Sequence, residues 1–165
     1  LQNVNRLFGK AQILSAVFLS YSHGKNDAQN AIGIMALAWA VYASQELIVE
    51  PWMQITSGLA IGVGTALGGW RVIHTLGSKV TRLNPVSGFS ANMAAASVIE
   101  VASNIGLPVS TTHTTTSAIL GVGLTKGTSA VQWKVIREII GAWLITSPAC
   151  SALGWILGKV LTALI

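Results

Sequence analysis

Residues 100–117, EVASNIGLPVSTTHTTTS, are the most informative segment of this sequence for predicting its fold. Gly106 and Pro108 interrupt an apolar run, and both residue types are typical of the end of a helix. Ser110 is typical of the start of the next helix. Every side chain of 110–117 carries a hydroxyl or an imidazole group. This segment therefore predicts a helix, then a short turn, then a second helix that begins directly after the turn. Polar side chains are expected where the two helices meet.

This interrupted element extends over 88–125, with its first helix from Gly88 to Ile105. Basic residues flank it on both sides: Arg71, Lys79 and Arg82 before it, and Lys126, Lys134 and Arg137 after it. Basic loops mark the cytoplasmic side of a membrane, so both ends are expected there. We favour a re-entrant helical hairpin over two short crossings, because irregular backbone at membrane depth needs a cover of protein or a water-filled cavity.

The composition is that of a membrane protein. Of 165 residues, 52% are hydrophobic and only 9% are charged, whereas a soluble domain carries roughly 25% charged residues. This excludes a soluble enzyme, a secreted disulfide scaffold, a disordered region and a DNA-binding domain. The net charge of +5 is not gathered into a basic patch, so no nucleic-acid partner is expected. We predict an all-α integral membrane protein in contact with lipids.

Uncharged runs mark the membrane segments. The segments 51–70 and 139–158 contain no charged residue, and about 20 apolar residues span a bilayer as a helix. The apolar sequence of 9–43 is interrupted by a polar break at 22–27, which predicts a broken helix. The organisation predicted for 1–165 is a broken-helix region 9–43, a spanning helix 51–73, the re-entrant hairpin 88–125 and C-terminal helices 131–165.

The polar break is the first candidate site, because polar groups inside a membrane are costly and usually functional. If a helix starts near Asn26, then Asn26, Asp27 and Asn30 project to one side. Their oxygens suit Na⁺ or a proton, and the amide NH₂ groups suit an oxyanion. Gly24 permits an unwound turn before them. The alternative is a solvated loop in which Asn26 or Asp27 is an ordinary N-cap.

The hydroxyl-rich stretch is the second candidate site. A helix N-terminus presents unpaired N–H groups and a partial positive charge, and it therefore binds anions. No Lys or Arg lies within 110–117, so an anion there is held by dipoles and can leave again. The alternative is a capped helix whose hydroxyls bond back to its own carbonyls.

Glu100 lies alone in the apolar first helix of the hairpin. It is either a candidate coupling carboxylate or the partner of a group on a neighbouring helix. A zinc site is not expected, because the histidines lack ligand spacing. A hydrolytic triad is not expected either, because Ser22, His23 and Asp27 share one short turn. The chain is therefore not predicted to be an enzyme, and no cofactor is predicted beyond a coupling ion.

Two motifs together carry a family resemblance. The segments His23–Gly33 (HGKNDAQNAIG) and Ser103–His113 (SNIGLPVSTTH) are similar to the two motifs of the inorganic phosphate transporter (PiT) family. The linking Ser87–Ser90 and the Ala142-Trp143 stretch also fit. The resemblance covers nearly the whole chain. Lys25 departs from it, since the family usually has a small residue there; its ammonium group either raises anion affinity or extends to the membrane surface.

The resemblance implies half of a transporter. The family is built from two inverted repeats that each carry both motifs, and this chain holds one copy of each. We expect this chain to be the C-terminal repeat half, with the N-terminal repeat half as its partner. Whether the assembled transporter also forms a homodimer is not decided by the resemblance. By motif, the expected phosphate ligands are Asn26, Asp27, Asn30, Ser110, Thr111 and Thr112. The expected Na⁺ ligands are Asn26, Asp27, Asn30, Ser110 and Thr111.

The expected function is cation-coupled symport of inorganic phosphate by alternating access, in the cytoplasmic membrane of a prokaryote. Na⁺ is favoured as the coupling ion, with H⁺ as the alternative. The nearest other function is a sulfate permease of the same superfamily, and a more distant one is an anion channel.

Overall fold

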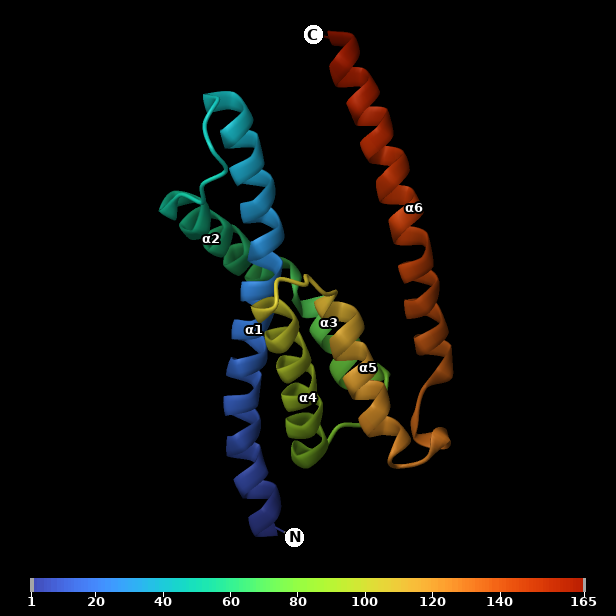
Figure 1. Cartoon of the computed structure of the whole chain (residues 1–165). Helices are drawn as coiled ribbons and strands as arrows, with labels where there is room; N and C mark the ends of the chain where they lie inside the picture. Colours follow the sequence, from blue (N-terminus) through green and yellow to red (C-terminus); the bar gives the residue numbers. More distant parts are fainter. Residues whose placement is uncertain (1, 165) are drawn as a thin grey trace. The chain divides into compact units, whose positions relative to one another are not determined.

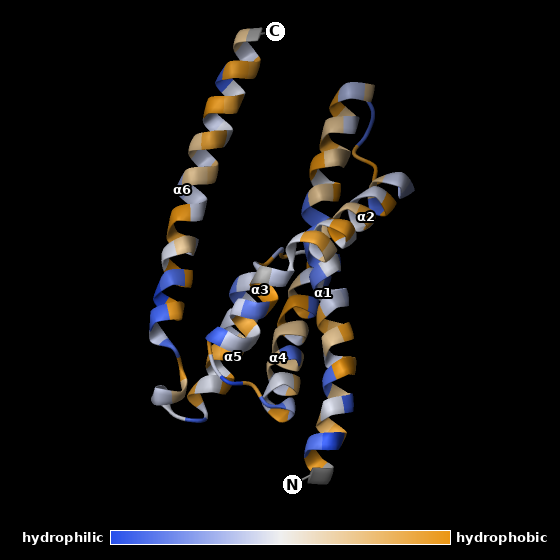
Figure 2. Cartoon of the chain, turned by 180° about the vertical axis from the view of Figure 1, so that it is seen from behind, coloured by the Kyte–Doolittle hydropathy of each residue, from blue (hydrophilic) through white to orange (hydrophobic). Residues whose placement is uncertain are grey.

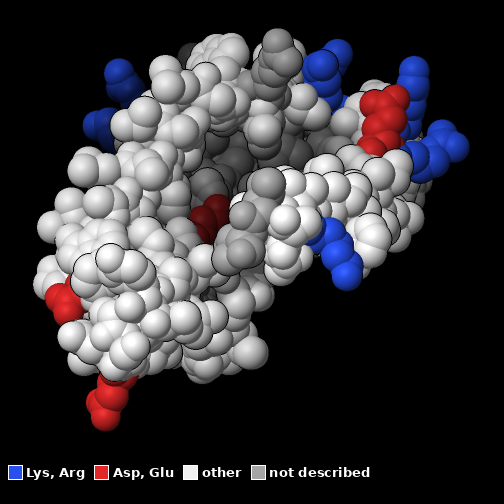
Figure 3. All heavy atoms as spheres, turned by 90° about the horizontal axis from the view of Figure 1, so that it is seen from above, with Lys and Arg blue, Asp and Glu red and all other residues white. Residues whose placement is uncertain are grey.

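The structure is a computed structural model that describes residues 2–164. Within these residues the chain forms helices joined by turns, and none of them belongs to a β-strand. The all-α prediction is confirmed. The chain divides into two compact units, Leu1–Val131 and Gln132–Ile165. Figure 3 shows that uncharged residues make up most of the face seen in that view, in keeping with the low charge of the sequence.

Helix α1 (Gln2–Ala43) is continuous over 42 residues (Figure 1). The prediction of a broken helix at 9–43 is therefore wrong. Three polar side chains of this region do not need an unwound backbone, because Lys25, Asn26 and Gln29 bond to groups of residues 100–109. Figure 2 shows the resulting hydrophilic zone in the middle of α1, between more hydrophobic stretches.

Helix α2 (Pro51–Gly68) is followed by the short helix α3 (Trp70–His74) and a π-helical turn, η1 (Thr75–Lys79). The predicted spanning helix 51–73 is thus divided near Gly69, although the Gly69 N–H still bonds to the Thr65 carbonyl at 2.9 Å. Proline at the first helical position favours the start of α2. The pair α1 and α2 is joined by an edge-to-face contact between Trp39 and Trp52.

Helices α4 (Pro85–Asn104) and α5 (Thr111–Leu124) form a helical hairpin. α4 begins before the predicted Gly88, because Asn84 and Ser87 form a capping box ahead of it. At the tip, Gly106 has a φ of 75°, which glycine adopts without steric cost. Ser110 is the N-cap of α5, and its hydroxyl oxygen accepts a hydrogen bond from the His113 N–H.

The hairpin packs against the N-terminal part of α1 (Figure 1). The buried apolar side chains of α4 are mostly alanines, which let helix backbones approach closely; they are Ala91, Ala95, Ala96, Ile99 and Ala102. Phe8 of α1 meets Phe89 of α4 edge to face. Gly88 lies so close to α1 that a Cβ there would collide with the Gln12 side chain.

The two ends of the hairpin meet at its base. Thr81 forms an isolated antiparallel bridge with Val131, and its hydroxyl donates to the Ala130 carbonyl at 2.9 Å. Ala130 ends the 3₁₀ turn η2 (Thr128–Ala130). The Lys126 ammonium group donates to Ser87 Oγ at 3.1 Å. The chain therefore enters and leaves the hairpin at the same place.

The second unit is dominated by helix α6 (Trp133–Leu164), with Pro148 inside it. The sequence predicts several C-terminal helices over 131–165, whereas the described residues form one; residue 165 lies outside them. By length and hydropathy, Trp133–Ala163 is the one candidate membrane span among the described residues. Proline is tolerated inside such helices. Figure 2 shows hydrophilic residues near the start of α6 and mainly hydrophobic ones beyond it.

Candidate anion and cation site

The tip of the hairpin contacts the middle of α1 through Asn26. The Asn26 side chain is fully buried. Its Nδ2 donates to the Val109 carbonyl at 2.7 Å, and its Oδ1 accepts from the Val109 N–H at 3.1 Å. These bonds join the two polar clusters that the sequence singled out.

An open cavity of about 510 Å³ lies beside this contact. It is lined by residues of α1 and of the hairpin tip: Asp27, Asn30, Pro108, Val109, Ser110 and Thr111. Four predicted site residues, Asp27, Asn30, Ser110 and Thr111, are thus brought together. Two others are not among the lining residues: Asn26 is buried behind the cavity wall, and Thr112 is exposed.

The hairpin side of the cavity is suited to an anion. The first N–H groups of a helix have no intrahelical partner, and they give the start of α5 a partial positive charge. The Ser110 hydroxyl accepts from the His113 N–H at 3.3 Å, and a hydroxyl that accepts one bond can still donate another. Thr111 adds a second hydroxyl at the wall. These neutral donors match the oxygens of a tetrahedral oxyanion.

The α1 side of the cavity carries a carboxylate. Asp27 Oδ2 lies 2.9 Å from His23 Nε2, and Asp27 Oδ1 accepts from Asn26 Nδ2 at 3.0 Å. The Asp27 side chain is 37% exposed. Because each carboxylate oxygen has two lone pairs, Asp27 keeps free acceptor positions for a cation or for a protonated anion.

Glu100 pairs with α1 outside this cavity. Its Oε1 lies 2.7 Å from Lys25 Nζ, which also donates to Asn104 Oδ1 at 2.6 Å. Residues two apart on a helix project about 200° from each other, so Lys25 and Asp27 lie on opposite flanks of α1. Lys25 therefore does not line the cavity, and Glu100 pairs with a neighbouring helix.

Two contacts in and around the cavity were not specified by sequence reasoning. The peptide group of Val109 carries no side-chain signal, so its bonds to Asn26 were not foreseen. For Glu100, the predicted alternative of a partner on a neighbouring helix is the one observed, but Lys25 was not identified as that partner, although two opposite charges isolated in apolar helices were a usable signal. Ser103, whose hydroxyl lies 3.4 Å from Asn26 Oδ1, belongs to the same group.

Known proteins share sequence similarity with this chain. Residues 1–154 match the phosphate transporter family. A probable low-affinity inorganic phosphate transporter of Rhizobium meliloti is 46% identical over 90% of this chain and 45% of its own length. Its namesake in Bacillus subtilis is 41% identical over 93% of this chain and 47% of its own length. The chain spans less than half the length of these relatives.

A solved structure is also similar. It is described as the sodium-dependent phosphate transporter, and it shares 33% sequence identity with a TM-score of 0.78. The match covers 88% of this chain and 37% of that chain.

Proposed function

This chain belongs to the phosphate transporter family, and from this membership we propose that it is one half of a secondary transporter that carries inorganic phosphate together with Na⁺. The observation that carries the proposal is the cavity in which the start of α5 faces Asp27. Donors on one wall and a carboxylate on the other fit an anion and a cation bound side by side.

Phosphate fits this cavity better than sulfate. The two anions share a tetrahedral shape, but phosphate still carries a proton at neutral pH and can donate a hydrogen bond. Asp27 is an acceptor at the wall, and it would repel a fully deprotonated oxyanion. A sulfate permease remains the rival function, and an anion channel is a more distant one.

Na⁺ is the proposed coupling ion. A cation bound at Asp27 would offset the repulsion between the carboxylate and the anion, so each ion would favour binding of the other. Carboxylate, amide and hydroxyl oxygens from Asp27, Asn30, Ser110 and Thr111 are available at the cavity. The name of the similar solved structure, the sodium-dependent phosphate transporter, supports this choice over H⁺.

The other half of the transport path is proposed to be an inverted repeat of this one. The cavity is open, and the chain covers 45% of the Rhizobium meliloti relative. Inverted-repeat transporters bind substrate between their repeats, near the midplane of the membrane. We therefore propose that the N-terminal repeat half closes the open side of the cavity. The complete transporter is the assembly of both halves.

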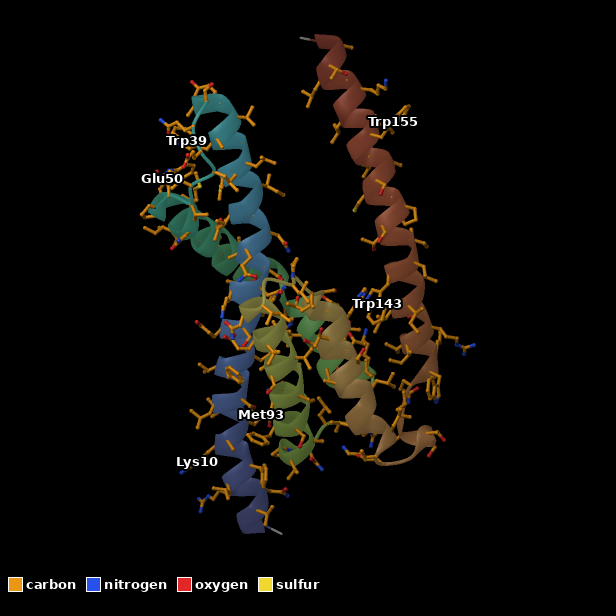
Figure 4. The ribbon with its side chains drawn as sticks, in the orientation of Figure 1. Lys10, Trp39, Glu50, Met93, Trp143 and Trp155 are labelled. Atoms are coloured by element: carbon orange, nitrogen blue, oxygen red, sulfur yellow. The ribbon has the colours of Figure 1, made fainter. Side chains whose placement is uncertain are left out.

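The hairpin is proposed to be re-entrant, from the cytoplasmic side of a prokaryotic plasma membrane. Its ends meet at Thr81 and Val131, and its tip reaches Asn26 about halfway along α1. Figure 4 places Lys10 and Glu50 at opposite ends of the pair formed by α1 and α2. Basic residues favour the cytoplasmic side, so Lys10 and the hairpin base are assigned to it.

Uptake of labelled phosphate into proteoliposomes that contain the assembled transporter tests this function. We expect an inward Na⁺ gradient to drive uptake, and excess unlabelled sulfate to leave it unchanged. Uptake driven only by a proton gradient would overturn Na⁺ coupling. Strong competition by sulfate would overturn the choice of anion, and flux without cation dependence would indicate a channel.

Replacing Thr111 with valine tests the anion wall. The change removes one hydroxyl and keeps the shape of the side chain. Because a hydrogen bond to a charged group contributes about 1.5–3 kcal/mol, we expect the KM for phosphate to rise by about tenfold or more. Thr112→Val is the matched control, since Thr112 does not line the cavity, and its KM should stay within about twofold of the parent value. Equal effects of both changes would contradict the assignment.

A further inference from the structure

We propose that Asn26 is a positioning residue that holds the start of α5 against α1, and that it is not a ligand of the anion or the cation. Its contacts with the hairpin are the basis of the proposal. Only the transport measurement below rests on the proposed function.

Protein groups occupy every hydrogen-bonding position of the Asn26 side chain. A carboxamide has two N–H donors and two acceptor lone pairs. The donors reach the Val109 carbonyl at 2.7 Å and Asp27 Oδ1 at 3.0 Å. The acceptors receive the Val109 N–H at 3.1 Å and the Ser103 hydroxyl at 3.4 Å. Because the side chain is fully buried, a bound ion would have to displace one of these partners.

The two bonds to Val109 constrain the neighbouring part of the site. The Asn26 amide bonds to both the N–H and the carbonyl group of Val109, as the backbone of a neighbouring β-strand would. Val109 directly precedes Ser110, the N-cap of α5. Holding Val109 therefore sets the position of the α5 N–H groups and of the Thr111 hydroxyl relative to Asp27, the next residue of α1. The bond from Asn26 Nδ2 to Asp27 Oδ1 orients that carboxylate.

Asn26→Asp separates the two roles. An aspartate keeps the shape of the side chain, and its oxygens would serve a cation at least as well as an amide oxygen. It lacks the N–H donors, however, and would leave the Val109 carbonyl without its partner. Asn30→Asp is the matched control, because Asn30 lies one turn further along α1 and lines the cavity.

Hydrogen–deuterium exchange of the tip peptide, residues 105–112, is the direct measurement. It reports local opening without requiring transport activity. In the assembled transporter, we expect Asn26→Asp to accelerate exchange of the tip amides by about tenfold or more, and Asn30→Asp to leave it unchanged. Parent-like exchange in Asn26→Asp would overturn the proposal. So would equal acceleration in both variants.

Ser103→Ala provides a milder test that does not depend on whether Asn26→Asp folds. It removes only the longest of the four bonds, so we expect tip exchange to rise by about two- to threefold. The KM for phosphate should rise by a similar factor, while kcat and the Na⁺ dependence stay as in the parent. A change in KM with unchanged exchange, or no change in either, would overturn the proposal. If the parent fails to transport phosphate, the exchange results still decide the role of Asn26.

Discussion

Asp27→Asn is expected to abolish Na⁺-driven phosphate uptake, with the initial rate at least about 100-fold below that of the parent. The change removes the carboxylate from the cavity wall and keeps the size of the side chain. The amide oxygen can still accept the bond from Asn26 Nδ2, which is 3.0 Å long in the parent, so the fold should persist. Initial rates in proteoliposomes, at matched protein content, measure the effect.

Glu46→Gln is the matched control for this experiment. It also converts a carboxylate into an amide, but Glu46 is exposed in the loop between α1 and α2. We expect uptake by this variant to equal that of the parent. Asp27→Asn with a normal rate and an unchanged Na⁺ dependence would show that Asp27 does not couple the two ions.

Breaking the Lys25–Glu100 pair is expected to cause the largest loss of stability. Lys25→Met leaves the Glu100 carboxylate without its cation, and Glu100 Oε2 is already buried without a hydrogen-bond partner. The two side chains are partly buried, with 27% of Lys25 and 22% of Glu100 exposed, and a partly buried charge that loses its partner is destabilising. We expect Lys25→Met and Glu100→Gln each to lower the thermal unfolding midpoint of the assembled transporter in detergent by roughly 5–10 °C.

The double variant distinguishes a true pair from two unrelated changes. Removing both charges together leaves no unpaired charge, so Lys25→Met with Glu100→Gln should unfold closer to the parent than either single variant. Lys10→Met is the control, because Lys10 is an exposed lysine of the same helix. If the two single losses add in the double variant, the charges do not stabilise each other.

Local chemistry made much of the hairpin predictable. Gly106, with its positive φ, and Ser110, with its N-cap bond, act within a few residues of their own positions. The sequence pattern at 100–117 therefore carries the information for the turn. The same holds for the polar character of the site, because hydroxyls, amides and a carboxylate stand out in a chain with so few charged residues.

An all-α membrane protein with two polar clusters could be predicted from the sequence alone, because composition, helix caps and turn residues are local properties. The tertiary structure was needed to show that α1 stays unbroken through 22–30, because the polar side chains there bond to partners about 75 to 83 residues further along the chain. It also decided that Asp27 faces the cavity while Asn26 faces the Val109 backbone. A helix turns by about 100° per residue, so the position of the hairpin selects which of the two neighbours lines the cavity and which one bonds to the hairpin tip.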